Sequence, residues 1–452
     1  MTNEQKIYPL TICGAGPAGL GAIIQSAKMG LLSNLLEDGV AVIENSNKIG
    51  GGSLTKYDIN SNTLAKVLLE AFDTVDSRCL FLEYMDKNNI NNISNIKDHY
   101  IPCREMGLFL NELGEAVSSI FNKYKNSHII RNSKLESINL KSDGSQEIIY
   151  SSSGKSKSIK SLNTILTLGA EQPLDSLKKK FITGNIQLEK YESKVIPSSY
   201  ILKKDNTARQ LILKKLNVKH PRIVILGGSH SAWSVAWFVI NRFKSWLNKT
   251  INLNPASIII AHRSNIKLFY NSADEALSDN YVFNQNTDIC SLSGRVNRFG
   301  GLRGDAFDLA KECIISGEGG SLVNLVSLTN SSEKRIEAIL DAADIIIPAF
   351  GYRARTVPIF DNTGNFIPLK FDSTGLVIDE HTRILKEDGG VLNNILAYGL
   401  GAGMRTSQKV GGESALSGRV DGIWLFQNDV GRVAINTLLK NLKKNQLKEG
   451  CK

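Results

Sequence analysis

Two short apolar runs along the chain are each followed by a cluster of glycine or small residues and then by a helical pattern. The first run covers residues 7–13 and precedes an apolar-periodic stretch at 17–29, which predicts a buried strand that turns into a helix. The second run covers 222–226 and leads into a helix at 233–243 and a strand at 257–261. Strands that alternate with helices in this way predict an α/β fold with parallel sheets.

The remaining segments place strands of the first unit at both ends of the chain. We expect strands at 40–44, 164–169 and 395–399, alternating strands within 133–159, helices at 64–72 and 105–124, an asparagine-rich loop at 88–95, and a strand entering a turn at 344–352. The simplest arrangement has two Rossmann-like dinucleotide-binding domains, the second inserted in the first. The first domain then comprises 1–206 and 345–452, and the inserted domain comprises 207–344.

The first glycine cluster matches the dinucleotide fingerprint G-x-G-x-x-G. With 38 glycines in the chain, chance alone gives roughly 0.3 such matches, so the context has to decide. Here a strand precedes the motif, a helix follows it, and Glu44 ends the next strand, where an acid can accept hydrogen bonds from ribose hydroxyls. These positions predict FAD at the helix start, bound by Gly14, Gly16, Pro17, Ala18, Gly19 and Glu44.

Three consecutive glycines, 50–52, follow soon after Glu44. Glycine gives the backbone freedom to run close to a ligand, and an extended FAD would lie nearby. We therefore count Gly51 and Gly52 as candidate FAD contacts. A plain loop is the alternative.

The second cluster is Gly227-Gly228-Ser229-His230-Ser231-Ala232, in which Ser229 takes the place of the middle glycine. Its hydroxyl can join the phosphate contacts, or the ligand is slightly displaced. Arg263 lies just beyond the next strand, where an arginine meets a 2′-phosphate, and this favours NADPH over NADH. A surface arginine is the alternative. The predicted NADPH-binding residues are Gly227, Gly228, Ser229, His230, Ser231 and Arg263, with His230 as a phosphate neighbour or helix cap rather than a catalyst.

The formal net charge is +10, but the lysines are spread along the chain without interleaved aromatic residues, which is typical of solvated faces and not of a nucleic-acid site. No apolar run reaches membrane-spanning length, the N-terminus has no signal-peptide pattern, and a cytoplasmic enzyme is expected. The six cysteines show neither a C-x-x-C pair nor zinc-like spacing. We therefore expect no metal and no disulfide-reductase chemistry. Assembly into a homo-oligomer is compatible with the sequence.

Two such nucleotide motifs resemble the flavin-dependent monooxygenases of class B-like type, in which one flavoprotein carries out both reduction and oxygenation. The resemblance covers most of the chain and is nearest to the amine N-hydroxylases. Besides the two turns it is carried by Ala349-Phe350-Gly351-Tyr352, like the family's A-T-G-Y, and by Ile101-Pro102-Cys103-Arg104-Glu105. It implies that Gly351 and Tyr352 lie near the nicotinamide, and that Arg104, Gly399 and Gly401 contact a cofactor.

Several departures from the family limit the subclass. The F-x-G-x-x-x-H-x-x-x-W/Y fingerprint is absent, and Phe350 replaces a threonine. Residues 399–403 read G-L-G-A-G where related flavoproteins often have G-D, so the usual aspartate near the FAD ribityl chain is missing. Stretches 274–307 and 403–417 match no motif, and we take them as candidates for the substrate wall.

The resemblance implies an NADPH-dependent flavin monooxygenase that oxygenates a small metabolite through a flavin hydroperoxide, with amine N-hydroxylation as the first candidate reaction. Its partners would be a small-molecule substrate and molecular oxygen. The sequence offers no acid–base dyad, and we assign no catalytic side chain. An NADPH-linked FAD reductase or oxidase is the enzymatic alternative, and a flavoprotein redox sensor without turnover is the alternative from another class.

Overall fold

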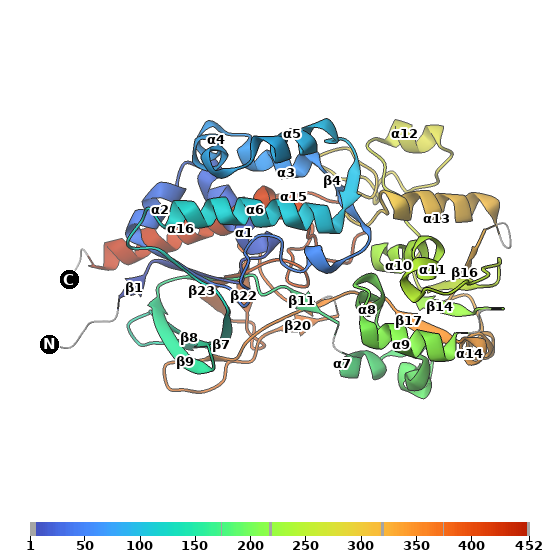
Figure 1. Cartoon of the computed structure of the whole chain (residues 1–452). Coiled ribbons are helices and arrows are strands. Elements are labelled where there is room, and N and C mark those ends of the chain that lie inside the picture. The colour runs from blue at the N-terminus through green and yellow to red at the C-terminus, as the bar shows by residue number, and fades with distance from the viewer. Residues whose placement is uncertain (1–5, 173, 217–218, 318–320, 374, 450–452) are drawn as a thin grey trace.

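The protein is described by a computed structural model that covers residues 6–172, 174–216, 219–317, 321–373 and 375–449 (Figure 1). It is a mixed α/β protein, as expected. Figure 1 shows two units side by side, one containing both ends of the chain and one formed by its middle. None of the helices in this described part is both long and apolar enough to cross a bilayer.

The first unit is built on a six-stranded sheet in the order β22-β23-β10-β2-β3-β6. The strands are β2 (Leu10–Cys13), β3 (Val40–Ile43), β6 (His128–Ile130), β10 (Thr164–Leu166), β22 (Arg383–Leu385) and β23 (Val391–Ala397). All neighbours pair in parallel except β22 and β23. The central strands β2, β3 and β10 are fully buried, since layers cover both faces.

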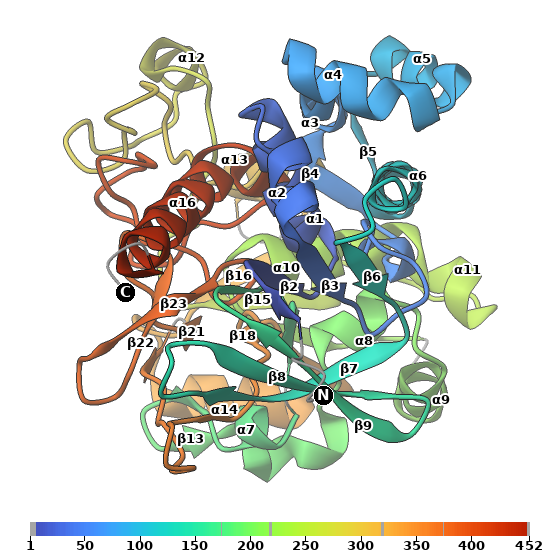
Figure 2. The ribbon, with the colours of Figure 1, turned by 90° about the vertical axis from the view of Figure 1, so that its left-hand side faces the viewer.

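Helices cover one face of this sheet and a second sheet covers the other (Figures 1 and 2). The helices are α1 (Pro17–Lys28), α2 (Leu32–Asp38), α6 (Cys103–Phe121), α15 (Ile423–Gln427) and α16 (Asp429–Glu449). The second sheet has the order β1-β9-β8-β7-β19. Its strands are β1 (Ile7–Tyr8), β7 (Ser133–Leu140), β8 (Gln146–Ser152), β9 (Lys155–Ser161) and β19 (Ile359–Phe360).

The middle of the chain forms a four-stranded parallel sheet in the order β16-β15-β14-β17. The strands are β14 (Ile223–Leu226), β15 (Ile258–His262), β16 (Val323–Ser327) and β17 (Ile345–Pro348). One buried cluster joins the sheet to α8 (Ser198–Leu202), α9 (Asn206–Lys215), α10 (His230–Asn241), α11 (Phe243–Leu247) and α13 (Asp305–Ser316). A separate cluster joins its other face to α7 (Leu174–Lys178), β12 (Phe181–Thr183), β13 (Ile186–Gln187), η4 (Leu188–Lys194) and α14 (Glu333–Ala342).

The four-stranded sheet and the layers that cover it include residues outside the range 207–344 that the sequence pattern predicts for this unit. Strand β17 lies after residue 344 and pairs with β14 along its whole length. Before residue 207, Ile182 and Leu188 are buried against β14 and β15. The edges of this sheet and of the layers that cover it therefore do not coincide with residues 207 and 344.

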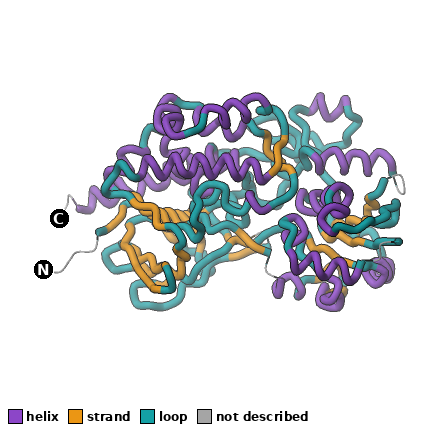
Figure 3. The backbone as a smooth tube through the Cα atoms, in the orientation of Figure 1, coloured by secondary structure: helices purple, strands orange, loops and turns teal. Residues whose placement is uncertain are grey.

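The chain crosses between the two units twice, and the crossings lie side by side. Strand β11 (Ala170–Glu171) pairs antiparallel with β18 (Arg353–Ala354). Loops make up much of the region between the units (Figure 3). The other short elements are η1 (Leu54–Lys56), β4 (Asn60–Leu64), α3 (Lys66–Leu69), η2 (Glu70–Phe72), α4 (Val75–Phe81), η3 (Leu82–Tyr84), α5 (Lys87–Asn95), β5 (Tyr100–Pro102), α12 (Ala273–Ser278), β20 (Phe371–Asp372) and β21 (Gly375–Leu376).

Three predicted elements differ from the structure. The asparagine-rich segment 88–95 is not a loop but helix α5, whose N-cap Asp86 accepts a hydrogen bond from the Asn88 amide and whose Ile93 is buried. The strand predicted at 7–13 is divided at Pro9 between β1 and β2, which belong to different sheets. The helix predicted at 64–72 begins only after β4 and consists of α3 followed by η2.

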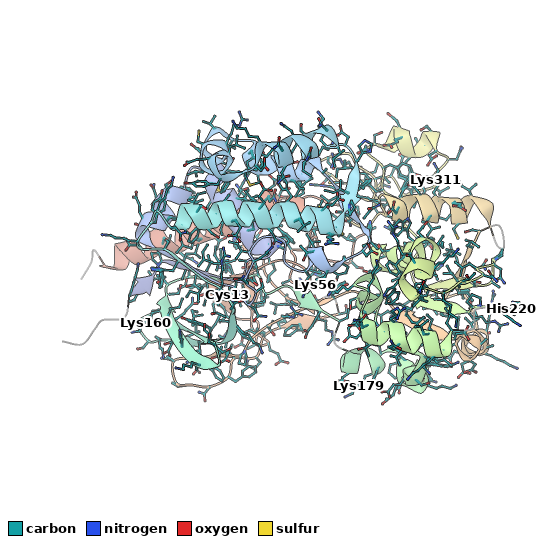
Figure 4. All side chains as sticks on the ribbon, viewed as in Figure 1. Cys13, Lys56, Lys160, Lys179, His220 and Lys311 are labelled. Carbon is teal, nitrogen blue, oxygen red and sulfur yellow. The ribbon has the colours of Figure 1, made fainter. Side chains whose placement is uncertain are left out.

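Basic side chains are dispersed over the molecule, as the sequence predicts. Lys160 lies on β9 in the first unit and Lys179 follows α7 in the second, and Figure 4 shows them in different parts of the molecule.

Candidate active site

The first glycine turn has the geometry that a dinucleotide phosphate site requires. Gly14 has φ +92°, and a Cβ there would lie 2.4 Å from the Thr167 carbonyl oxygen. A Cβ at Gly19 would lie 2.0 Å from the Gly14 carbonyl oxygen, so helix α1 can approach the turn only with glycine at this position. The first turn of α1 contains no acidic residue. The positive end of the helix is therefore available to an anion, and the residues fit a dinucleotide pyrophosphate.

Glu44 lies directly beside this turn. Its carboxylate accepts hydrogen bonds from the Ala15 amide at 2.7 Å and from the Ser46 amide at 2.8 Å. These two amides fix the carboxylate at the end of β3, where its remaining lone pairs can accept bonds from ribose hydroxyls.

The glycines at 50–52 have mainly a packing role. A Cβ at Gly50 would lie 1.8 Å from the Leu110 carbonyl oxygen, and one at Gly51 would lie 2.2 Å from that of Gly107. The Gly51 amide also donates to Asn111 Oδ1 at 2.9 Å. The loop therefore needs glycine in order to pass close to α6. Gly52 is different, because a Cβ there would lie 3.3 Å from Gly16 Cα, beside the phosphate turn.

An acid that the sequence reading missed lies beside the later glycine loop. A Cβ at Gly399 would lie 3.3 Å from Ala18 Cβ, at the start of α1. The Asp421 carboxylate accepts a hydrogen bond from the amide of Gly401, and burial raises its pKa to about 6. The usual G-D aspartate is missing, but a carboxylate from further along the chain reaches the same loop.

The second glycine turn is also tightly packed. Gly227 has φ +137°, and a Cβ there would lie 2.7 Å from the Ala349 carbonyl oxygen. Ser229 is the N-cap of α10 in an extended conformation and makes no side-chain capping bond. Its hydroxyl is therefore not committed to the helix, in agreement with a contact to a bound phosphate.

Arg263 lies with two further cations at the carboxyl end of β15. Arg263 Nη2 donates to the carbonyl oxygens of Phe181 at 2.6 Å and Ile182 at 3.0 Å, on the α7 side of the sheet. Burial, followed by the charges of Arg353 and Arg263, lowers the pKa of Lys180. These three cations form a group that suits a phosphate, and we call it the Arg263 group. The sequence predicts only Arg263, because the other two come from distant segments.

His230 lies at the first position of α10. Its Nε2 accepts a hydrogen bond from the backbone amide of Arg303 at 3.0 Å. Burial, and after it the charge of Arg303, lowers the pKa of His230 to about 4. The ring is therefore neutral at neutral pH, and it orients the Arg303 loop without contributing a positive charge.

A cavity of about 960 Å³ lies between the two units. Its volume is in the range of small-molecule and cofactor sites. The predicted residues that line it are Gly227, Gly228, Ser229, His230, Ser231, Arg263, Gly351, Tyr352 and Gly401. The predicted residues outside its lining are Gly14, Gly16, Pro17, Ala18, Gly19, Glu44, Gly51, Gly52, Gly399 and Arg104. Arg104 is exposed on the first turn of α6, so the structure does not bring it to this site.

Tyr352 joins the two units at the cavity. Its hydroxyl hydrogen-bonds to that of Tyr57 at 2.9 Å. Burial raises the pKa of Tyr352, so both hydroxyls stay protonated at neutral pH. Gly351 has φ +81°, and a Cβ there would meet no atom within 4 Å, so the turn is open toward the cavity side.

Stretches 274–307 and 403–417, which match no motif, both contribute residues to the cavity lining. Arg295, Arg298 and Arg303 line it from the first stretch, and residues 415–417 line it from the second. Glu413, which is fully buried, connects them: its carboxylate accepts hydrogen bonds from the amides of Phe299 at 3.1 Å and Gly300 at 2.6 Å.

The chain can be compared with known proteins over nearly its whole length. No protein-family model matches the chain. A CMP-5′-(3-aminopropyl)phosphonate hydroxylase from Streptomyces rubellomurinus is 27% identical over 438 residues, which are 96% of this chain and 98% of that protein. Over nearly its whole length the chain is therefore similar to a hydroxylase, in agreement with the resemblance to flavin-dependent monooxygenases that the sequence motifs carry.

Two solved hydroxylase structures have a similar fold. An ornithine N-hydroxylase from Kutzneria sp. 744 matches with a TM-score of 0.54 at 14% identity, over 96% of this chain and 99% of that one. An ornithine hydroxylase from Pseudomonas aeruginosa matches with a TM-score of 0.55 at 13% identity, over 97% of this chain and 100% of that one. At these identities the likeness concerns the fold of the monooxygenase and not its substrate.

Proposed function

We propose that this monooxygenase hydroxylates the nitrogen of a small primary amine. The overall reaction joins the amine, O₂, NADPH and a proton to give the hydroxylamine, NADP⁺ and water. One observation carries the proposal: the glycine turn of the second unit and the Gly401–Asp421 loop of the first line the same cavity. A hydride donor, a flavin and a substrate can therefore meet there.

We infer that the two units are Rossmann-like domains and that the middle one, which holds NADPH, is inserted in the one that holds FAD. FAD supplies the activated oxygen when it is bound and reduced. In the FAD unit, the start of α1 would hold the pyrophosphate and Glu44 the ribose. The close contact of Gly399 with Ala18 supports a cofactor path from that turn toward the cavity.

In the NADPH unit, the turn at 227–231 would hold the pyrophosphate. The Arg263 group would hold the 2′-phosphate, since the three cations lie at the carboxyl end of β15, where the adenosine ribose of a Rossmann-bound nucleotide lies. Gly351 and Tyr352 would border the nicotinamide. For Arg104, the family resemblance is the sole support for a contact with a cofactor.

Asp421 is the side chain that we assign to the amine. Of the described residues that line the cavity, only Glu70 and Asp421 are acidic. Glu70 is held by Asn428 Nδ2 at 2.9 Å, whereas Asp421 lies beside the Gly401 loop of the first unit, where we place the flavin. A carboxylate at the flavin end of the cavity would bind the substrate ammonium and direct its nitrogen to the oxygen donor.

The test is a panel of small primary amines, thioethers and ketones added to the FAD-loaded enzyme with NADPH and labelled O₂. We expect an amine to increase NADPH consumption and to gain one labelled oxygen atom. Hydrogen peroxide as the sole product across the whole panel would mean an oxidase and would contradict the proposal. Slow reaction with O₂ would indicate a reductase. A cytoplasmic location and a homo-oligomeric state stay predictions.

A further inference from the structure

The cavity contains a second group of cations, apart from the Arg263 group. It consists of Lys267, Arg295, Arg298 and Arg303, all from the segment between β15 and α13, and we call it the Arg303 group. Arg303 immediately precedes α13, which packs on the α10 side of the sheet. Arg263 contacts the opposite, α7 side. One bound NADPH 2′-phosphate therefore cannot account for both groups.

Two of the four cations in the Arg303 group already have acidic partners. Lys267 Nζ lies 2.7 Å from Asp288 Oδ1, and Arg298 Nη2 lies 3.7 Å from Asp429 Oδ2. For Arg295 and Arg303, no carboxylate of the described residues lies at ion-pair distance. Arg303 Nε is buried and has no hydrogen-bond partner within the part of the chain that the structure describes.

The buried Glu413 carboxylate acts on Arg303 without forming an ion pair with it, so a bound anion would supply the close counter-charge that an enclosed guanidinium lacks here. Burial lowers the pKa of Arg303 to about 10, so the group is still cationic at neutral pH. Arg295 is exposed at the mouth of the cavity. One unpaired cation inside and one at the mouth match a group that carries two negative charges.

Arg303 is also held in place before any ligand binds. Its guanidinium carbon lies 3.9 Å from the centre of the Phe269 ring, and its Nη2 donates to the Arg298 carbonyl oxygen. Its backbone amide donates to His230, and the preceding turn is fixed by Glu413. A cation fixed in this way is suited to recognising a planar face of oxygen atoms.

We propose that Arg303 and Arg295 bind a phosphate or phosphonate dianion on the substrate that carries the amine. This inference rests on the proposed function, and it makes the substrate a molecule with an anion at one end and an amine at the other. The anion would lie at the Arg303 group and the amine at Asp421, on the flavin side. The Streptomyces relative is named for a compound that likewise joins an amine to a phosphonate, there linked to CMP.

The experiment measures binding and not turnover. The FAD-loaded, oxidised enzyme is titrated by calorimetry with 3-aminopropylphosphonate, with 4-aminobutyrate as the carboxylate analogue and with 1-aminobutane as the analogue that lacks an anionic group. We expect the phosphonate to bind at least tenfold more tightly than either analogue, because each charge-assisted hydrogen bond contributes strongly. Equal binding of phosphonate and carboxylate would overturn the phosphorus-specific assignment, and no phosphonate binding would overturn the site.

Matched variants separate this site from the NADPH site. Arg303→Gln should weaken phosphonate binding about ten- to hundredfold and keep the affinity for NADP⁺. Arg263→Gln should weaken the binding of NADP⁺ and keep the affinity for the phosphonate. Loss of NADP⁺ affinity in Arg303→Gln, with phosphonate binding intact, would assign Arg303 to the dinucleotide and refute the proposal.

Thermal stability gives a readout that does not depend on the reaction. Without ligand, the Tm of Arg303→Gln gives the baseline of the variant, since the change also removes the contacts of the guanidinium with Phe269 and with the Arg298 carbonyl oxygen. The phosphonate should raise the Tm of the wild type and not that of the variant. If the amine is never hydroxylated although the phosphonate binds as described, the proposed reaction fails while the anion site stands.

Discussion

His230 Nε2 accepts a hydrogen bond from the backbone amide of Arg303 at 3.0 Å. This bond ties the glycine turn of the second unit to the cavity wall that carries the Arg303 group. A protonated Nε2 could not accept it, so the connection depends on a neutral imidazole. At the start of α10, His230 thus positions a neighbouring loop and offers no positive charge to a phosphate.

The stability of the fold should therefore depend on pH through His230. Its pKa is about 4 in the folded state against an ordinary 6.5. The unfolded chain takes up the proton first as the pH falls, so the stabilisation is present above 6.5 and is lost between 6.5 and about 4. From pH 7 to pH 5 the wild type should lose up to about 2 kcal/mol in free energy of unfolding through this group.

The check is urea denaturation at both pH values for the wild type and for His230→Gln. Glutamine keeps an acceptor near the position of Nε2 and does not titrate. The variant should show a smaller loss of stability between pH 7 and pH 5. Equal losses in the two proteins would show that His230 is protonated in the folded state or that it is not the group responsible.

Cofactor preference should depend on the Arg263 group as a whole. Lys180→Met removes one cation without disturbing the bonds that Arg263 makes to the carbonyl oxygens of Phe181 and Ile182. It should raise the KM for NADPH about tenfold and leave that for NADH nearly unchanged. Arg263→Ala should reduce the preference about ten- to hundredfold. A preference that survives both changes would place the 2′-phosphate elsewhere.

Asp421→Asn should separate amine binding from cofactor binding. If the carboxylate binds the amine, the variant keeps FAD and is still reduced by NADPH, but its KM for the amine rises and more NADPH is consumed per product formed. In the wild type, kcat/KM for the amine should fall as the pH drops below about 6, where Asp421 becomes protonated. Release of FAD from the variant would instead assign this carboxylate to the ribityl chain.

The parts of the site that could be predicted are those encoded by short, local patterns. The turns at Gly14 and Gly227 are each formed by a strand, a glycine cluster and a helix that follow one another, so the sequence alone locates them. Helix α5 was predicted as a loop because its asparagine residues have a low helix propensity. In the structure the burial of Ile93 overrides this propensity.

The parts that could not be predicted depend on contacts between distant segments. Arg303 meets His230 across 73 positions in the sequence, and Glu413 meets Phe299 across 114. Asp421 reaches the Gly401 loop from beyond an irregular stretch that has no periodic pattern. For Arg104, a short motif predicts a cofactor contact. In the structure this arginine is exposed and lies outside the cavity lining.

Substitution of Gly16 should weaken FAD binding alone, whereas substitution of Gly19 should lower both FAD binding and the stability of the fold. Gly16 has φ −71° and ψ −166°, which any residue can adopt, and the nearest atom to an added Cβ would be Gly52 Cα at 3.6 Å, an ordinary contact. Gly16→Ala and Gly16→Val should therefore fold with nearly unchanged Tm in the absence of FAD. Because the side chain occupies the space needed by the pyrophosphate, both should lose most of their affinity for FAD, the valine variant more so.

Gly19→Ala is the matched control for this prediction. Its Cβ would lie 2.0 Å from the Gly14 carbonyl oxygen and 2.9 Å from Thr167 Oγ1, so α1 would have to move away from the sheet. This variant should lose stability as well as FAD, seen as a lower Tm of the apoprotein and poor soluble yield. Retention of FAD by a folded Gly16→Val would show that the cofactor does not pass over this turn, and the assignment of the first unit to FAD would then be wrong.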